Sequence, residues 1–543
     1  MFGLPTLECI AGYNVTMLGT LVVLVSGILL GVSVLYTHAW FLVLIALVPA
    51  LYVFDLSDLS YKKTFLLGWV FGTIFHLTLF SAYAWSMLPL DWLGFTGYTQ
   101  YVLIGSAWTL LSLTLGFSIG FVALWVSKKG LKSWIDALSL ASLWVLCEVF
   151  GAFLFSIVFW GSGSLLGTHF SFGFIGYALA NDLILVQLAT VGGVYILSWA
   201  VVVINALLYC AFFVKGRREQ LVCGVVVLAV LCAVVFGHAF WKPDFTKTQV
   251  GQNIRVSAAH FDVPSRLTPD PEREKEVIDR VELLISSAKD SDVLLLPESV
   301  SLLESLRKSQ EIDTWPYIKG LFVNQNSLPV IIDSATVRER DGKLYNRIEY
   351  FDAVSGDSLL QRKQFLQSFG EYLPEIYKRA LNIFGRGAYV DTLGNYRELS
   401  NGNNTELFSS RDRVKIATLS CAEMASPSLY KKSVKDGAQI IFNVASYGWF
   451  HGSPAVFSHA QLIAKVRAVE NRRFYVQASN AVPSFIIDPY GIETARSSFK
   501  KDEMLFAEVI ALEQLTVYSR FGNLILIVFM LILSLGAFKK SNR

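Results

Sequence analysis

One cysteine in the polar half of this chain is a candidate nucleophile. Cys421 is the only cysteine between residues 242 and 520, and it follows an apolar run typical of a buried strand, residues 414–420. Glu298 ends a second such run. Lys363 lies two residues before the segment Phe-Leu-Gln-Ser-Phe-Gly-Glu-Tyr-Leu-Pro at 365–374. A base, a cation and a thiol therefore occur in one region, and these groups together suit nucleophilic chemistry at a carbonyl carbon.

A thiol attacks well only as a thiolate, so it needs a base or a cation beside it. Glu298 could take the thiol proton. Lys363 could lower the thiol pKa and stabilise the oxyanion that forms when Cys421 attacks, together with the backbone N–H that follows the cysteine. The three groups would then transfer an acyl chain through a thioester. Spacing alone leaves a second interpretation open, in which a small buried cysteine lies near a surface lysine and a capping glutamate.

Three histidines of the polar region do not have the spacing of metal ligands. His260, His451 and His459 are therefore interpreted as structural or surface residues, and we expect neither a metal nor a cofactor.

The composition excludes a wholly soluble protein. Of the 543 residues, 53% are hydrophobic and only 16% are charged, and most of the charge follows Trp241. The net charge is +3, and no basic stripe is interleaved with aromatic residues, so we expect no nucleic acid partner. The sequence predicts a membrane domain over residues 1–241, a polar domain over 242–520, and a closing membrane helix with a basic tail over 521–543.

Apolar segments long enough to cross a bilayer recur along the chain. A helix needs about 20 apolar residues to cross the hydrocarbon core. We predict eight spans, near residues 17–36, 38–54, 64–84, 101–126, 136–159, 187–213, 220–240 and 521–538. Glu148 falls in the middle of the fifth span, where an ionisable group needs a buried partner or has a function.

Basic residues occupy alternate loops between these spans. The loops 85–100 and 160–186 contain no lysine or arginine. Because basic residues near helix ends prefer the cytoplasmic side, the pattern predicts that the polar domain lies on the opposite face. The basic residues are Lys62, Lys63, Lys128, Lys129, Lys132, Lys215, Arg217, Arg218, Lys539, Lys540 and Arg543.

Strand-like and helical runs alternate in the polar domain, which predicts a layered α/β sheet. Glu298 and Cys421 follow strand-like runs, and catalytic groups commonly lie in loops at strand ends. Strands are predicted at 254–261, 293–298, 329–338, 415–420, 439–445, 474–478 and 485–488, and helices at 271–289, 301–325 and 455–472.

Several motifs resemble the nitrilase, or carbon–nitrogen hydrolase, superfamily. They are Pro297-Glu298, Lys363 with Glu371 eight residues later, Cys421-Ala-Glu423, and the segment 467–473. Seven spans, a nitrilase-like domain and one closing span further resemble the apolipoprotein N-acyltransferase family. The membrane segments 144–148, 176–177 and 187–193 are also similar to that family.

The resemblance implies an αββα sandwich and a ping-pong reaction in a bacterial inner membrane, with the sandwich on the periplasmic side. Cys421 would take a fatty acyl group from a phospholipid and pass it to the α-amine of a diacylated lipoprotein cysteine. By motif, Glu298 is the base, Lys363 the oxyanion partner and Cys421 the nucleophile. Glu371 and Glu423 match acidic positions that would orient Lys363 and the active-site loop, or would form local salt bridges.

Aromatic residues are candidates for a wall that shields the thioester from water. Trp449 and Phe450 are assigned to substrate contact. The loop 85–98, with Trp85, Trp92 and Phe95, belongs either to this wall or to an aromatic belt at the membrane interface.

The chain departs from the family pattern in ways that concern substrate contacts more than the reacting groups. Ala422 occupies a position where the family often has an aromatic residue after the cysteine. Residues 446–450, Ser-Tyr-Gly-Trp-Phe, differ from the Asn-Asp-Ala-Trp-Phe-like stretch of the family. The tryptophan usual after the first strand is missing from 258–268. These differences bear on the choice of acyl donor.

Two other functions are compatible with the same residues. A membrane-tethered amidase would use the same trio, although eight helices are many for an anchor. A transporter with a non-catalytic external domain is a second alternative, but matching halves with interrupted helices were not found in the sequence.

Overall fold

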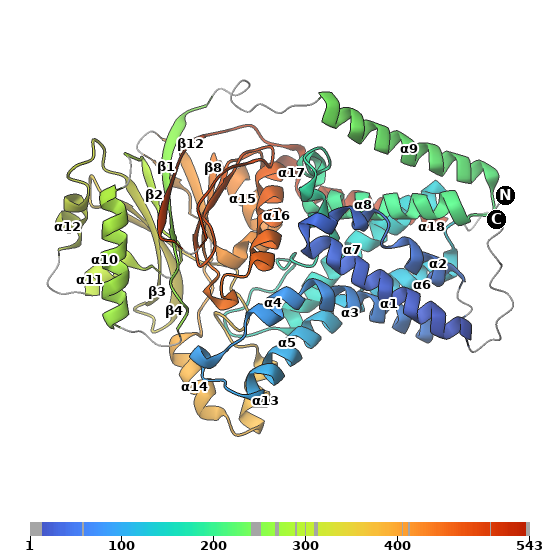
Figure 1. Ribbon diagram of the computed structural model, residues 1–543, viewed down its shortest axis with the longest axis horizontal. Helices are drawn as coiled ribbons and strands as arrows, with labels where there is room; N and C mark the ends of the chain where they lie inside the picture. The colour runs from blue at the N-terminus through green and yellow to red at the C-terminus, as the bar shows by residue number, and fades with distance from the viewer. Residues whose placement is uncertain are drawn as a thin grey trace.

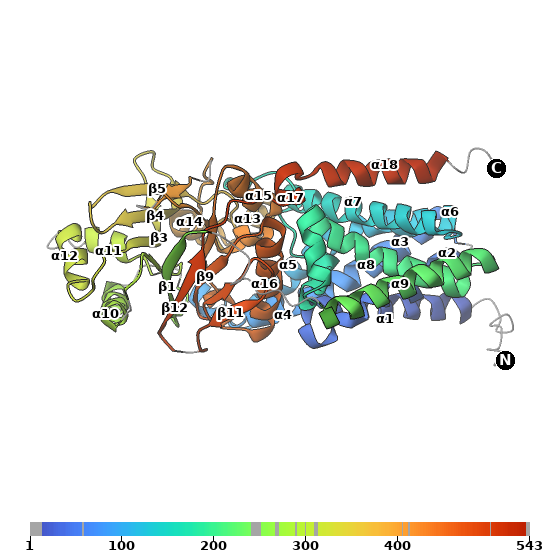
Figure 2. The same cartoon turned by 90° about the horizontal axis from the view of Figure 1, so that it is seen from above.

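The computed structural model consists of a helical bundle at one end and an α/β part at the other (Figures 1 and 2). It describes residues 14–538 except 57–58, 241–250, 267–270, 288–289, 299, 309–312, 404–405, 411–412 and 500. Cys9, the predicted domain junction at 241–242 and the basic tail from Lys539 lie outside the described residues.

Helices occupy all eight segments that the sequence predicts as spans. Six segments within the described residues are long and apolar enough to cross a membrane: 17–35, 37–56, 98–129, 134–158, 185–213 and 217–240. The helices and 3₁₀ turns are α1 (Asn14–Leu35), η2 (Thr37–Leu44), α2 (Val48–Leu56), α3 (Tyr61–Leu79), α4 (Ser81–Ser86), η3 (Asp91–Leu93), α5 (Tyr98–Phe117), α6 (Ile119–Lys129), α7 (Trp134–Val158), η4 (Ile175–Asn181), η5 (Leu185–Leu188), α8 (Ala189–Phe213), α9 (Arg217–Phe240) and α18 (Leu524–Phe538).

The other two predicted spans are α3 and α18, which do not meet the same length and hydropathy standard. Helix α3 is less apolar because it contains Lys62, Lys63 and His76, and glycines in this region let neighbouring helices approach closely. A Cβ on Gly68 would lie 2.4 Å from the Cβ of Ala123, and one on Gly116 would lie 2.4 Å from the backbone nitrogen of Thr73. Its packing against α5 and α6 therefore depends on small residues rather than on lipid contact.

The α/β part confirms the predicted layered architecture. Strand β1 pairs in parallel with β2, pairs antiparallel with β12, and meets β9 only at His260 and Phe261, so the twelve strands form two linked layers. The strands are β1 (Asn253–Phe261), β2 (Val293–Leu295), β3 (Val330–Arg338), β4 (Leu344–Asp352), β5 (Ser358–Arg362), β6 (Phe408–Ser409), β7 (Lys415–Ser420), β8 (Ile440–Ser446), β9 (Tyr475–Asn480), β10 (Phe485–Ile487), β11 (Glu493–Arg496) and β12 (Glu503–Ile510).

Alternating side chains of the strands fill separate cores. On β1, Val256 and Ala258 belong to the core between the two strand layers, whereas Ala259 and Phe261 belong to the core beneath the outer helices. One outer helical layer contains α10 (Pro271–Ser287), α11 (Leu302–Lys308) and α12 (Thr314–Leu321), and the other contains α15 (Pro427–Lys435) and α16 (Pro454–Asn471) (Figure 1). Short helices α13 (Glu375–Ile383), α14 (Gly387–Tyr396) and α17 (Val517–Phe521) and 3₁₀ turns η7 (Cys421–Ala425) and η8 (Gly448–Phe450) complete the fold.

The local structure differs from the prediction in three ways. The single helix predicted over 301–325 consists of α11 and α12, and α12 begins after Asp313. Strands β4, β5, β6, β11 and β12 were missed. On β4, polar and charged residues interrupt the apolar ones; Arg347 and Glu349, for example, take part in ion pairs at the sheet. The predicted strand at 293–298 ends earlier, which leaves Glu298 in the following turn.

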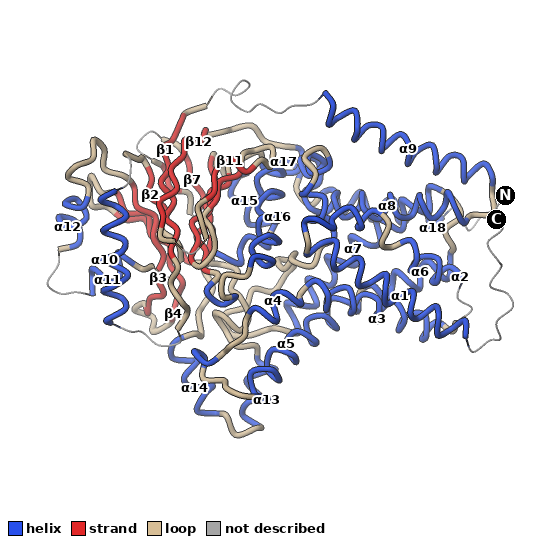
Figure 3. Tube along the Cα trace, in the orientation of Figure 1, coloured by secondary structure: helices blue, strands red, loops and turns tan. Residues whose placement is uncertain are grey.

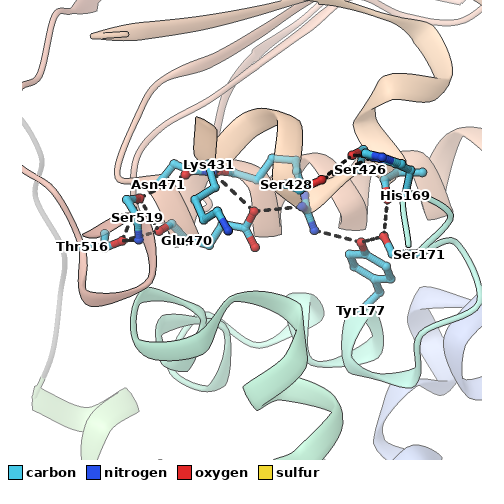
Figure 4. A network of polar contacts seen from close by, with 12 residues as sticks. His169, Ser171, Tyr177, Ser426, Ser428, Lys431, Glu470, Asn471, Thr516 and Ser519 are labelled. Carbon is cyan, nitrogen blue, oxygen red and sulfur yellow. Dashed lines mark hydrogen bonds and ion pairs between the residues drawn. The ribbon is translucent and has the colours of Figure 1, made fainter. Parts of the chain in front are cut away.

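Helix α16 joins the two parts of the molecule, since it packs on the sheet and also contacts α8 and η4. A buried ion pair lies in this interface: Nη1 of Arg467 is 2.9 Å from Oε1 of Glu470, and both side chains are fully buried. Arg467 also donates a 2.9 Å hydrogen bond to the hydroxyl of Tyr177, which lies 2.5 Å from Oγ of Ser171 (Figure 4). The α/β part is thus bonded to the loop before α8.

Replacing Arg467 by Met should destabilise the protein by about 3–5 kcal/mol, because Glu470 would be left buried without its cation. Burial already raises the pKa of Glu470 to about 7, and loss of the arginine raises it further. A raised folded-state pKa means that stability is lost as pH rises through that pKa, so the deficit should be larger at pH 8 than at pH 5.5. Thermal unfolding in detergent at both pH values measures this.

The double variant R467M/E470Q is the matched control, because it removes both charges. It should recover most of the lost stability and should show little difference between the two pH values. Equal losses in the single and double variants would contradict the buried-charge explanation.

Candidate functional site

Cys421 lies at the carboxyl end of β7, where the parallel strands β7, β8 and β9 present their ends at one edge. It begins η7 with φ of +45°, a left-handed conformation that is strained for a residue with a side chain and is common at functional sites. The thiol sulfur lies 3.8 Å from the carbonyl oxygen of Ser446, at the end of β8. The chain therefore turns sharply at the thiol.

Glu423 holds this turn in place. One carboxylate oxygen accepts a 2.7 Å hydrogen bond from the backbone N–H of Ser420, and the other accepts bonds from the N–H groups of Gln364 and Phe365 at 2.8 and 3.2 Å. Burial raises the pKa of Glu423, although Lys363 and the three N–H groups oppose this effect. Glu423 thus bonds the cysteine turn to the segment that follows Lys363.

Lys363 is a buried cation between two carboxylates. Its side chain is 1% exposed, and Nζ lies 2.8 Å from Oε1 of Glu371 and 3.4 Å from Oε1 of Glu298. Burial alone would lower its pKa, but the charges of Glu298, Glu371 and the nearby Cys421 outweigh burial and raise the pKa. Lys363 is therefore held as an ammonium ion at neutral pH.

Glu298 lies in the turn after β2, and its Oε1 oxygen receives several donors. Asn346 donates to it at 2.5 Å, Ser420 Oγ donates at 3.1 Å, and Lys363 is the charged partner. The amide of Asn346 also donates to Glu371 at 3.1 Å. Sequence reasoning missed Asn346 and Ser420 because neither belongs to a recognised motif; a polar residue within a buried strand was the only available signal.

The thiol of Cys421 is protonated in the resting protein. Burial raises its pKa to about 12, the charges of Glu298 and Glu371 raise it as well, and Lys363 and the Ser446 carbonyl contact oppose them. Attack on a carbonyl therefore requires the proton to leave as the bond forms, and Glu298 and Glu371 are the carboxylates whose charges act on the thiol. The arrangement can perform acyl transfer, with Lys363 stabilising negative charge on oxygen.

A single cavity of about 790 Å³ contains these groups and continues to the helical bundle. Glu298, Lys363 and Cys421 line one part of it. Residues of the bundle line another part: Phe80, Tyr83, Ala84, Met87, Leu90, Leu93, Phe95, Leu103, Ile104, Ala107, Trp108, Leu111, Phe155, Phe159, Phe170 and Phe172. A polar reaction centre thus opens onto an apolar chamber built by membrane-span helices and their loops.

The predicted aromatic wall is partly present. Trp449 and Phe450 on η8 both line the cavity, with ring centres 4.5 Å from Trp92 and 5.4 Å from Tyr83. Phe95 lines it too. Trp85 does not: it is 59% exposed and packs on Trp108, which is itself a lining residue.

Within the described residues, no group of three His, Cys, Asp or Glu side chains is arranged to hold a metal ion. The three histidines considered above contact oxygen atoms instead: His459 the Tyr83 hydroxyl, His260 the Ser479 carbonyl and His451 the Ser86 carbonyl.

Comparison with known protein families gives two matches that follow one another along the chain. Residues 26–207 match the apolipoprotein N-acyltransferase N-terminal domain, and residues 264–517 match the carbon–nitrogen hydrolase domain.

Whole proteins are also similar to this chain over nearly their full length. Apolipoprotein N-acyltransferase of Pseudomonas syringae pv. tomato is 25% identical over 521 residues, with 92% of each chain covered. The protein of the same name from Geobacter metallireducens is 26% identical over 530 residues, covering 93% of this chain and 91% of its own.

Among solved structures, Nit3 of Saccharomyces cerevisiae, a member of the nitrilase superfamily, covers 50% of this chain and 95% of its own, with 18% identity and a TM-score of 0.35. The two domains, in this order and over most of the sequence, identify the chain as a member of the apolipoprotein N-acyltransferase family.

Proposed function

We propose that the protein transfers a fatty acyl chain from a phospholipid to the α-amine of the diacylglyceryl-cysteine at the amino terminus of a lipoprotein. The observation that carries the proposal is the shared cavity, in which Glu298, Lys363 and Cys421 meet a chamber lined by bundle side chains. A long acyl chain can lie in the apolar part while its ester reaches the thiol. The names of the similar proteins support the lipoprotein acceptor.

In the first half-reaction, the sulfur of Cys421 attacks the ester carbonyl while Glu298 takes the thiol proton. Lys363 and the backbone N–H of Ala422 stabilise the oxyanion. The C–O bond of the ester then breaks, the lysophospholipid oxygen takes the proton from Glu298, and the acyl chain remains on sulfur as a thioester.

In the second half-reaction, the neutral amine of the acceptor attacks the thioester. Glu298 takes a proton from the amine nitrogen, Lys363 again stabilises the oxyanion, and the C–S bond breaks. The sulfur recovers the proton, and an amide is released. An apolar cavity favours the amine over water, because the thioester would hydrolyse in an open site.

The proposed location is a bacterial inner membrane with the α/β part on the periplasmic side. Helix α6 ends at Lys129, which pairs with Asp136 near the start of α7, and these helix ends lie away from the sheet (Figures 1 and 2). Basic residues prefer the cytoplasmic side, so the sheet would lie on the opposite side. Loop 160–186, which lies nearest the α/β part, carries no lysine or arginine.

Incubation with phospholipid in the absence of acceptor should load one fatty acyl group on Cys421. Mass spectrometry of the intact protein should show the acyl mass, and hydroxylamine should remove it. Cys421→Ala should show no loading and no triacylated lipopeptide product. Product formation by the alanine variant would rule out the thioester route and the proposed function of Cys421.

Glu298→Gln should change two reactions of the thiol in opposite directions. The charge of Glu298 raises the pKa of Cys421, so its removal should increase the rate of alkylation by iodoacetamide at pH 8. Acyl loading should fall by about 10²-fold or more, because the base is lost.

In the wild-type protein, alkylation should keep rising with pH to at least pH 10, since a thiol pKa of about 12 leaves little thiolate at neutral pH. Alkylation and loading that fall together in Glu298→Gln would indicate a misfolded site rather than a lost base.

Lys363→Met should lower acyl loading by about 10²-fold or more, because the oxyanion loses its cation. Lys378→Met is the matched control: Lys378 also pairs with two glutamates, Glu375 at 3.0 Å and Glu398 at 2.7 Å. We expect the control to load acyl chains at nearly the wild-type rate. A Lys363→Met protein that loads normally would exclude Lys363 from the reaction.

A further inference from the structure

Arg397 follows helix α14 and lies beside a pair of tryptophan rings that come from different parts of the molecule. The centre of its guanidinium is 6.0 Å from the ring centre of Trp92, on η3, and 5.9 Å from that of Trp449, on η8. The two rings pack edge to face. Figure 1 shows α14 beside the segment that joins α4 to α5. Aromatic faces of this kind orient a guanidinium and leave its N–H groups free to bind in the plane.

Arg397 shares the cavity with the reacting groups. It is among the cavity-lining residues, together with Glu298, Lys363 and Cys421. Its Nη2 atom donates to the backbone carbonyl of Arg266, and no ion pair with a carboxylate is present among the described residues. Burial lowers the pKa of Arg397, and the more distant charges of Glu371 and Glu298 only partly offset this effect. A cation in such a place is stabilised by an anion that enters the cavity.

The indole N–H of Trp92 is a second donor at the same place. Its nitrogen is buried, and it has no hydrogen-bond acceptor in the part of the chain that the structure describes. Buried donors are normally bonded, so an unpaired one beside an arginine indicates an acceptor that arrives with a ligand. The guanidinium centre lies 6.0 Å from the centre of the indole ring, so the two donors are neighbours.

We propose that Arg397 and the indole N–H of Trp92 bind the phosphate of the donor phospholipid. This inference rests on the proposed function and assigns a subsite to its first substrate. In a phospholipid, only the glycerol unit separates the phosphate from the acyl ester. An anion at Arg397 would therefore hold the ester close to Cys421 while the acyl chain enters the apolar chamber. A guanidinium binds phosphate through charge-assisted, paired hydrogen bonds.

The subsite acts on one half-reaction only. The acceptor offers its amine to a thioester that has already formed, after the lysophospholipid and its phosphate have left. Loss of Arg397 should therefore weaken acyl loading from phospholipid but leave transfer from the loaded enzyme to the lipopeptide unchanged. A carboxylate of the acceptor peptide is the competing anion, and its use of Arg397 would affect transfer instead.

The test compares two acyl donors with the full-length protein in detergent. One donor is a phospholipid, and the other is the p-nitrophenyl ester of the same fatty acid, which has no phosphate. For Arg397→Gln, we expect the KM of loading from phospholipid to rise by about tenfold or more, whereas loading from the p-nitrophenyl ester stays within about twofold of wild type. Arg397→Lys should recover part of the loss, and Trp92→Phe should raise the same KM by a smaller factor.

Arg379→Gln on exposed α13 is the matched control for charge, and it should load both donors normally. Equal losses with both donors in Arg397→Gln would overturn the proposal and indicate a structural role. Unchanged loading from phospholipid, or a defect confined to transfer, would also overturn it. Failure of the wild-type protein to load from either donor would instead refute the proposed function itself.

Discussion

The burial of Lys363 between two carboxylates is the interaction on which the rest of the site depends. A charged amine removed from water is costly unless anions and hydrogen bonds compensate it, and Glu298 and Glu371 supply that compensation. Their positions require the turn after β2, the start of the segment after β5 and the amide of Asn346 on β4 to meet at one point. Once they meet, the cation lies beside the thiol of Cys421, where it opposes the effect of burial on the thiol pKa.

The helical bundle contributes to this centre as more than an anchor. Aromatic side chains of α4, α5 and α7 line the same cavity as the cysteine. The loop before α8 also supports the cysteine turn directly: both the N–H and the hydroxyl of Ser171 donate to the carbonyl of Ala425, the last residue of η7, and His169 contacts Ser426 (Figure 4). Through Tyr177 this contact continues to the buried ion pair on α16. A site for lipid substrates needs this direct contact between the α/β part and the helical bundle, because the reactive groups are polar and the substrates are held in a membrane.

Much of the architecture was predictable from local pattern. All eight apolar segments are helical, the strands that carry long apolar runs lie where they were expected, and helix α16 was predicted to within one residue at each end. Strands β4, β5, β6, β11 and β12 were missed, and one predicted helix proved to be two. On β4, polar residues find their partners far away in the sequence, as Arg347 does with Glu304, so no local period reveals the strand.

The sequence by itself determined which segments are apolar and that Glu298, Lys363, Glu371, Cys421 and Glu423 are among the reactive or charged groups available. These properties are local, because they depend on residue type and on the spacing of neighbours along the chain. Only the tertiary structure decided that the five groups converge, that the thiol is protonated at rest, and that Arg397 lies beside the paired rings of Trp92 and Trp449. Distances across the fold and removal from water set charge interactions and pKa values, and neither quantity exists until distant segments pack together.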